Sequence, residues 1–187
     1  MQDTLKGENV KKNENERFPG KIQTFNQEEN QFTFRCDNGV TLLVTVLTNK
    51  IIRFRYATNG IFQKDFSYAI DPKFKPDSPE IEFTDKSDHY RITTKRLICR
   101  VRKEGLIVKL LDKSGTMIFE DEKGFHWEDD LEHGGEIIKI SKQLKPKEFF
   151  YGLGDKTNRL NLRKNRYQIW GTDSYGYGKN TLAAGYE

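Results

Sequence analysis

Apolar and polar side chains alternate with a period of two along much of this chain. In residues 31–36, Phe32, Phe34 and Cys36 face one way, and the polar residues between them face the other. This pattern predicts a strand with one buried face. Other runs that alternate or are rich in β-branched residues predict further strands at 40–48, 52–56, 90–94, 97–102, 106–111, 116–120 and 137–144.

Turn motifs separate the predicted strands. Residues 37–39 read Asp-Asn-Gly, and an Asn-Gly pair suits a tight hairpin because it accepts positive backbone dihedral angles. Residues 71–79 hold three of the five prolines and predict a loop or edge connection. No window keeps helical spacing for more than about two turns. Short strands with such turns predict an all-β fold, an antiparallel β-sandwich with little helix.

The start of the chain has a different composition. Residues 1–20 carry few large apolar side chains and predict a polar lead-in, so the sandwich is expected over residues 21–181. Residues 1–17 lack the apolar core of a signal peptide. No apolar run approaches the roughly 20 residues of a membrane span. The sequence therefore predicts a soluble, cytoplasmic protein that does not interact with a membrane.

Composition limits the classes of partner. The 187 residues are only 35% apolar, but 13 Phe and 8 Tyr supply material for a core. The net charge of +4 comes from interspersed charges of both signs, without a basic face, and argues against nucleic-acid binding. Cys36 and Cys99 each lie in an alternating run, which favours buried free thiols.

Three motifs resemble functional sites, but a simpler structural interpretation is favoured for each of them. Residues 126–133 gather two histidines and four carboxylates, but their spacing matches no standard zinc motif, and a solvated acidic loop is favoured over a metal site. Gly152 and Gly154 lack the third glycine of a dinucleotide fingerprint and predict a turn. The basic residues between 156 and 166 favour a solvated hairpin face over a phosphate site. No cofactor or metal is expected.

The most distinctive stretch covers residues 149–177. It opens with a strand-like apolar run at 149–151, and a second short strand is expected at 167–170. A loop rich in Gly and Tyr follows around Asp173. The rings of Trp170, Tyr175 and Tyr177 offer apolar faces, and the Asp173 carboxylate accepts hydrogen bonds, a combination that suits a hydroxyl-rich ligand. The alternative for Asp173 is a turn residue that bonds its own backbone.

This stretch resembles the N-terminal domain of glycoside hydrolase family 31, the α-glucosidase and α-xylosidase group. Residues 151–155 read Tyr-Gly-Leu-Gly-Asp where the family has Tyr-Gly-x-Gly-Glu. Residues 167–173 read Tyr-Gln-Ile-Trp-Gly-Thr-Asp where the family has Tyr-x-x-Trp-Asn-Thr-Asp. Asp155 and Gly171 depart from the pattern, and both bear on how the loop is anchored.

The resemblance implies a galactose-mutarotase-like β-sandwich that precedes a (β/α)8 barrel. A loop of such a domain reaches the sugar pocket, where Asp173 orients a hydroxyl of an α-linked sugar, with Trp170 and Tyr175 beside it. Retaining hydrolysis needs two carboxyl groups about 5–5.5 Å apart, and the family carries both on the barrel. Residues 182–187 are interpreted as a truncated tail that precedes an absent barrel. The chain alone is therefore expected to be catalytically inactive.

Two alternatives from other functional classes stay open at this point. A free-standing carbohydrate-binding module would use Trp170, Tyr175 and Tyr177 as a stacking platform for sugar rings. A structural interaction domain would expose an apolar patch to a protein partner.

Overall fold

The computed structural model describes residues 15–66, 68, 70–71, 73–77, 79–153, 160–163 and 167. The chain divides into two compact units, Met1–Gln143 and Leu144–Glu187, and each is described by itself. The described residues of the first unit form ten strands, and no described residue is helical, so the all-β prediction is confirmed. Within the described residues, no helix is long and apolar enough to cross a membrane.

The first four strands form one antiparallel sheet in the order β1-β2-β3-β4. These strands are β1 (Ile22–Glu28), β2 (Gln31–Cys36), β3 (Thr41–Thr48) and β4 (Ile51–Ala57). The predicted Asn-Gly turn joins β2 to β3: Gly39 has φ 85°, and the Cys36 N–H donates to the Val40 carbonyl at 2.8 Å. The side chains of β2 alternate as predicted, with Phe32 and Phe34 fully buried.

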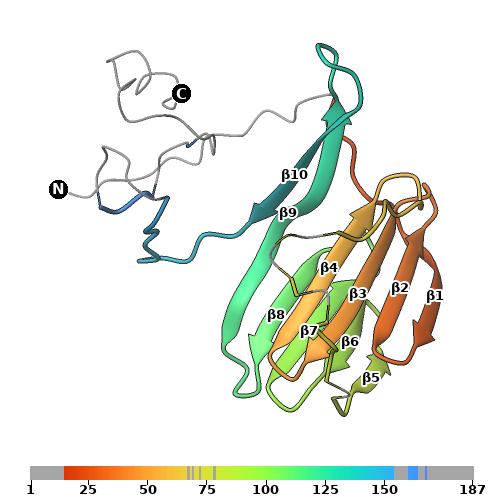
Figure 1. Ribbon diagram of the computed structural model, residues 1–187, viewed down its shortest axis with the longest axis vertical. Helices are drawn as coiled ribbons and strands as arrows, with labels where there is room; N and C mark the ends of the chain where they lie inside the picture. Colours follow the sequence, from red (N-terminus) through yellow and green to blue (C-terminus); the bar gives the residue numbers. More distant parts are fainter. Residues whose placement is uncertain are drawn as a thin grey trace. The chain divides into compact units, whose positions relative to one another are not determined.

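The remaining six strands form a second antiparallel sheet in the order β10-β9-β8-β7-β6-β5 (Figure 1). They are β5 (Glu82–Asp85), β6 (His89–Thr93), β7 (Leu97–Arg102), β8 (Val108–Asp112), β9 (Met117–Asp129) and β10 (Glu136–Lys142). Within each sheet, strands that follow one another in the sequence are paired, so each sheet is a meander. The described residues of the proline-rich stretch 71–79 lie outside any strand, as predicted.

The two sheets face each other across one hydrophobic core (Figure 1). Phe25 of β1 stacks on Phe83 of β5 with ring centroids 4.5 Å apart. Tyr56 of β4 stacks on Phe125 of β9 at 4.4 Å. Aromatic contacts thus join the sheets at both ends of the four-stranded layer, and the β-sandwich prediction is confirmed.

The prediction of an acidic loop at residues 126–133 is wrong for the first half of that range. β9 continues to Asp129, and Phe125, His126 and Trp127 are buried in succession. Consecutive burial hides the period-two pattern because both faces of β9 are covered here: Phe125 faces Tyr56, while His126 stacks on Phe18 with ring centroids 5.3 Å apart. A loop exists only between β9 and β10, where the Gly134 N–H donates to the Asp130 carbonyl.

Residues 16–18 cover the outer face of β9. Arg17 and Trp127 exchange two backbone hydrogen bonds, of 2.7 Å and 3.0 Å. The Glu16 carboxylate lies 3.0 Å from Lys123 Nζ and 3.2 Å from Lys139 Nζ, and His126 Nε2 lies 3.8 Å from the same carboxylate. Because the Glu16 side chain is only 10% exposed, its ion pairs with the two lysines are partly shielded from water.

Replacing Glu16 with glutamine is expected to lower the free energy of unfolding more at pH 7 than at pH 3. The hydrogen bond from Lys123 lowers the pKa of Glu16 below its usual value of 4.5, against the opposing effect of burial. A carboxyl group with a depressed folded-state pKa stabilises the fold above its unfolded pKa, and this contribution is lost as the pH falls through the folded pKa. Urea denaturation at both pH values measures the difference.

The matched control is Glu132→Gln, because the Glu132 side chain is 85% exposed. Its effect should be small at both pH values. A loss of stability in Glu16→Gln that is equal at pH 7 and pH 3 would contradict the role given to the ion pairs.

Candidate functional site

The three predicted ligand-binding residues, Trp170, Asp173 and Tyr175, lie outside the described residues. The structure does describe the beginning of the same stretch. These residues are Phe149–Leu153, 160–163 and Tyr167.

The prediction of a strand at residues 149–151 is wrong, because none of these residues lies in a strand. Phe149 and Tyr151 are 57% and 63% exposed. Phe150 makes a backbone contact as the acceptor of a 2.8 Å hydrogen bond from Leu162 N–H. Gly152 and Leu153 follow with positive φ of 121° and 67°, and Gly154, the second residue of the predicted turn, lies outside the described residues.

Asn161 and Arg163 tie this segment together. Asn161 Oδ1 accepts hydrogen bonds from the Phe150 N–H at 3.3 Å and from the Arg163 N–H at 3.1 Å. Arg163 Nη1 donates to the carbonyls of Lys145 at 2.9 Å and Glu148 at 2.6 Å. Arg163 was grouped with the basic residues expected on a solvated hairpin face. In the structure its guanidinium instead fixes the start of the segment that leads to Asp173.

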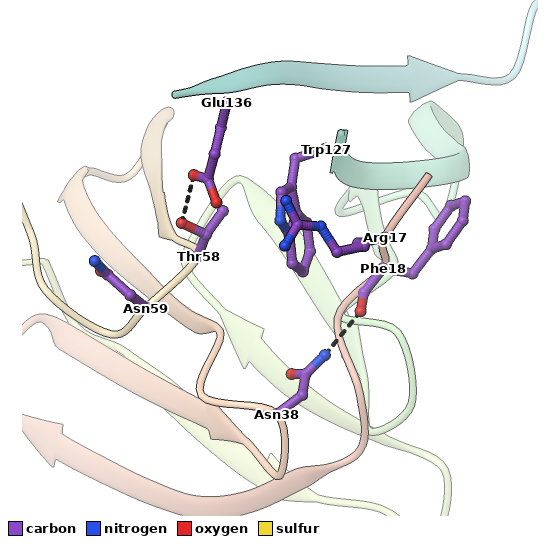
Figure 2. Close-up of a pocket in the computed structure, with 7 residues that line it drawn as sticks. All are labelled: Arg17, Phe18, Asn38, Thr58, Asn59, Trp127 and Glu136. Atoms are coloured by element: carbon purple, nitrogen blue, oxygen red, sulfur yellow. Dashed lines mark hydrogen bonds between the residues drawn. The ribbon is translucent and has the colours of Figure 1, made fainter. Parts of the chain in front are cut away.

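The β-sandwich unit contains a separate pocket of about 560 Å³. It lies where the segment before β1, the turns after β2 and β4, and the strands β9 and β10 meet (Figure 2). The lining residues are Arg17, Phe18, Asn38, Thr58, Asn59, Trp127 and Glu136.

Hydrogen bonds hold the rim of this pocket. Thr58 Oγ1 donates to Glu136 Oε2 at 2.7 Å and joins the turn after β4 to the first residue of β10. Asn38 Nδ2 donates to the Phe18 carbonyl at 2.8 Å, and its Oδ1 accepts from the Gly20 N–H at 3.2 Å. Figure 2 shows both side-chain contacts on opposite sides of the pocket. The rim is therefore tied to both sheets and to the N-terminal segment.

Trp127 and Arg17 form the wall of the pocket. The Arg17 guanidinium lies 5.5 Å from the centroid of the Trp127 ring and pairs with the Asp129 carboxylate. Trp127 is 5% exposed, and its Nε1 has no hydrogen-bond partner among the described residues. An indole N–H is a donor only, so this buried group needs an acceptor.

Sequence reasoning missed this pocket. Trp127 was assigned to a solvated loop, and Arg17 to a polar lead-in. The available signal was the aromatic character of Phe125 and Trp127, two residues apart, which is the spacing of a strand with one buried face.

The thiols and the acidic residues show no catalytic arrangement in the described part of the chain. Cys36 and Cys99 are free and buried, as predicted. Burial raises the pKa of Cys36 to about 11 and that of Cys99 to about 12, so both thiols are protonated at neutral pH. Among the described residues, no three His, Cys, Asp or Glu side chains are placed to hold one metal ion.

Comparisons with known proteins point to one family. A family model described as the glycosyl hydrolase 31 N-terminal galactose mutarotase-like domain matches residues 41–184. Alpha-glucosidase 2 of Bacillus thermoamyloliquefaciens is 24% identical over 157 residues, which are 83% of this chain and 19% of that protein. A GH31 dextranase of Flavobacterium johnsoniae, solved in complex with isomaltotriose, has a TM-score of 0.71 at 26% identity.

The dextranase match covers 87% of this chain and 20% of the dextranase. The cycloalternan-forming enzyme of Listeria monocytogenes has a TM-score of 0.63 at 15% identity, over 82% of this chain and 15% of that enzyme, and supports the fold alone. The chain therefore spans about a fifth of the length of the curated relative and of the dextranase.

Proposed function

Because the chain belongs to the glycosyl hydrolase 31 N-terminal galactose mutarotase-like domain family, we propose that it is the non-catalytic β-sandwich of an α-glucosidase-type glycoside hydrolase. In this role the domain packs on a catalytic (β/α)8 barrel and carries a loop to the substrate pocket. The observation that supports this most is the extent of the family match: residues 41–184 include the whole stretch that contains Asp173.

Asp173 acts as a positioning residue. Its carboxylate accepts a hydrogen bond from a sugar hydroxyl and holds the glycosidic bond in line with the reacting groups, which lowers the entropic part of the barrier. Trp170 and Tyr175 offer apolar faces to the same sugar. The proton transfer and the nucleophilic attack belong to two carboxyl groups of the barrel.

Exposed apolar side chains support packing against a further domain. Phe149, Phe150, Tyr151 and Leu153 are 57%, 40%, 63% and 38% exposed. Clustered apolar residues of this kind are typical of surfaces that another protein surface covers. These exposed side chains lie in the segment that precedes the proposed substrate loop. Contact between this segment and a barrel would also fix the start of the loop.

Replacing Arg163 with alanine in the glycosidase that contains this domain is expected to raise KM about 10-fold. The substitution removes two hydrogen bonds from a charged donor to the carbonyls of Lys145 and Glu148, which hold the segment before Asp173. A hydrogen bond from a charged donor contributes about 1.5–3 kcal/mol. Without these two bonds the segment before Asp173 is less ordered, and ordering it on substrate binding weakens the binding free energy. Steady-state kinetics with isomaltotriose and maltose measure the change.

Lys113→Ala is the control, because Lys113 is an exposed cation in the turn between β8 and β9. This variant should keep the KM of the parent enzyme. An unchanged KM in Arg163→Ala, with the fold intact, would count against the proposed loop.

The alternative of a free-standing carbohydrate-binding module assigns Trp170, Tyr175 and Tyr177 to a platform for sugar rings. It differs in one measurable respect: the isolated chain would bind sugar through Trp170 with no barrel present. In the relatives, the matched region is about a fifth of a longer enzyme. This favours the proposal that the chain is one domain of a glycoside hydrolase.

A further inference from the structure

We propose that the free edge of β10 is a self-association surface, at which a second copy of this chain pairs its own β10 in the antiparallel direction. β10 ends the six-stranded sheet, and its only neighbour among the described strands is β9 (Figure 1). In an antiparallel pair, the N–H and C=O groups of every second residue point away from the partner strand. On β10 these groups are a template for one more strand. Neither the Asp173 loop nor a barrel takes part in this pairing.

Three isoleucines make the edge apolar. Ile137, Ile138 and Ile140 are 42%, 52% and 56% exposed, and the register of β10 with β9 is regular from Glu136 to Ser141. The other described strands that end a sheet are less suited to pairing: β5 has four residues, β1 is paired irregularly with β2, and β4 carries two arginines. Short length, irregularity and charge are ways in which edge strands avoid association. An exposed, regular, apolar edge such as β10 favours it.

The two lysines of β10 do not keep a second copy away. Lysines on an edge strand usually oppose association because their charges repel. Lys139 Nζ, however, lies 2.8 Å from the Glu128 carboxylate and 3.2 Å from that of Glu16, and Lys142 pairs with the buried Asp121. Each cation is balanced by an acid of its own chain, so two β10 strands can approach without uncompensated repulsion.

The order of side chains along β10 selects a second copy as the partner. Successive side chains of a strand alternate between its faces, so four residues share one face: Glu136, Ile138, Ile140 and Lys142. This face reads acid, isoleucine, isoleucine, base. An antiparallel copy presents the same series in reverse, and a two-fold axis at Lys139 places each acid opposite a base and each Ile138 opposite an Ile140. A surface that complements itself is what a two-fold interface requires.

Both charged residues of this face can take a second partner. Glu136 accepts one hydrogen bond, from Thr58, and a carboxylate has about four acceptor positions. The Lys142 side chain is 41% exposed, and its ammonium has three donors, of which Asp121 uses one. Opposite charges directly across two strands stabilise the pair, and like charges destabilise it. The charges therefore favour the two-fold register over a shift that sets Lys142 opposite an isoleucine.

The test is sedimentation equilibrium of the 187-residue chain at concentrations up to about 1 mM. Two seven-residue strands bury less than the roughly 1,200 Å² of a stable complex, so a weak dimer is expected, with a Kd of about 100 μM. Ile138→Lys and Glu136→Lys should each raise this Kd about 10-fold, because each adds an uncompensated cation to the interface. Ile70→Lys is the matched control: Ile70 is 43% exposed in the loop between β4 and β5.

Disulfide cross-linking tests the register. Lys139→Cys places one thiol of each copy directly opposite the other, so oxidation should give a covalent dimer. Ile138→Cys should cross-link less, because its counterpart in the second copy is Ile140. The native thiols, Cys36 and Cys99, are buried and do not compete. Circular dichroism of each variant checks that the sandwich is folded.

Three results would overturn the proposal. In the first, the chain has the mass of one copy at every concentration, as expected if the β10 edge receives a strand of a different protein or of a further domain. In the second, Ile70→Lys weakens association as much as Ile138→Lys and Glu136→Lys do, which places the contact elsewhere. In the third, Ile138→Cys cross-links more readily than Lys139→Cys, which contradicts the two-fold axis at residue 139.

Discussion

Replacing Phe34 with alanine is expected to lower the free energy of unfolding by about 3–5 kcal/mol. Phe34 lies in β2, is 0% exposed, and packs against Phe25 and Tyr90 with ring centroids 5.3 Å and 5.2 Å away. Phe25 belongs to one sheet and Tyr90 to the other. The substitution thus removes the ring between the two layers, and the surrounding strands close only part of the cavity.

Urea denaturation followed by circular dichroism measures this loss. Single domains have about 5–15 kcal/mol of stability, so the variant is expected to be close to unfolding at 37 °C. Phe66→Ala is the matched control, because Phe66 is 65% exposed and should change the unfolding free energy by less than about 0.5 kcal/mol. Similar small effects in both variants would show that β2 is not at the centre of the core.

Alternation of apolar and polar residues was sufficient to predict the strands that bury one face. β2, β3, β4 and β7 follow the predicted ranges closely, because each combines alternating or β-branched residues with a clear turn motif at one end. The prediction was incomplete where burial does not alternate. In β9, Gly124 to Trp127 are buried in succession, and the neighbouring carboxylates Glu128 and Asp129 were interpreted as part of a loop.

The two candidate sites differ in how they appear in a sequence. The motif around Asp173 is local, so its residues were predicted together, although they lie outside the described residues. The pocket at Trp127 combines residues 17, 127 and 136, which meet only because β9 pairs with both the N-terminal segment and β10. No spacing in the sequence encodes that meeting, since the order of strands in a sheet depends on tertiary packing.

Replacing Asp173 with asparagine in the proposed glycosidase is expected to lower kcat/KM about 100-fold. Asparagine has nearly the same shape but lacks the charge, and hydrogen bonds to an ionised acceptor are about twice as strong as neutral ones. A carboxylate that positions the sugar also affects the alignment of the reacting atoms, where an error of 1 Å costs about 10²-fold in rate. The folded state should be unaffected, because the role proposed for Asp173 is in binding.

The most direct test of the proposed function is the kcat/KM of that enzyme on an α-linked oligosaccharide, measured for the unaltered protein, Asp173→Asn and Asp77→Asn. Asp77 is an exposed carboxylate in the proline-rich loop between β4 and β5, and it controls for the loss of one negative charge. The proposal predicts a fall of about 100-fold in kcat/KM for Asp173→Asn alone, with unchanged stability in both variants. An Asp173→Asn enzyme that keeps the kcat/KM of the unaltered protein would contradict it.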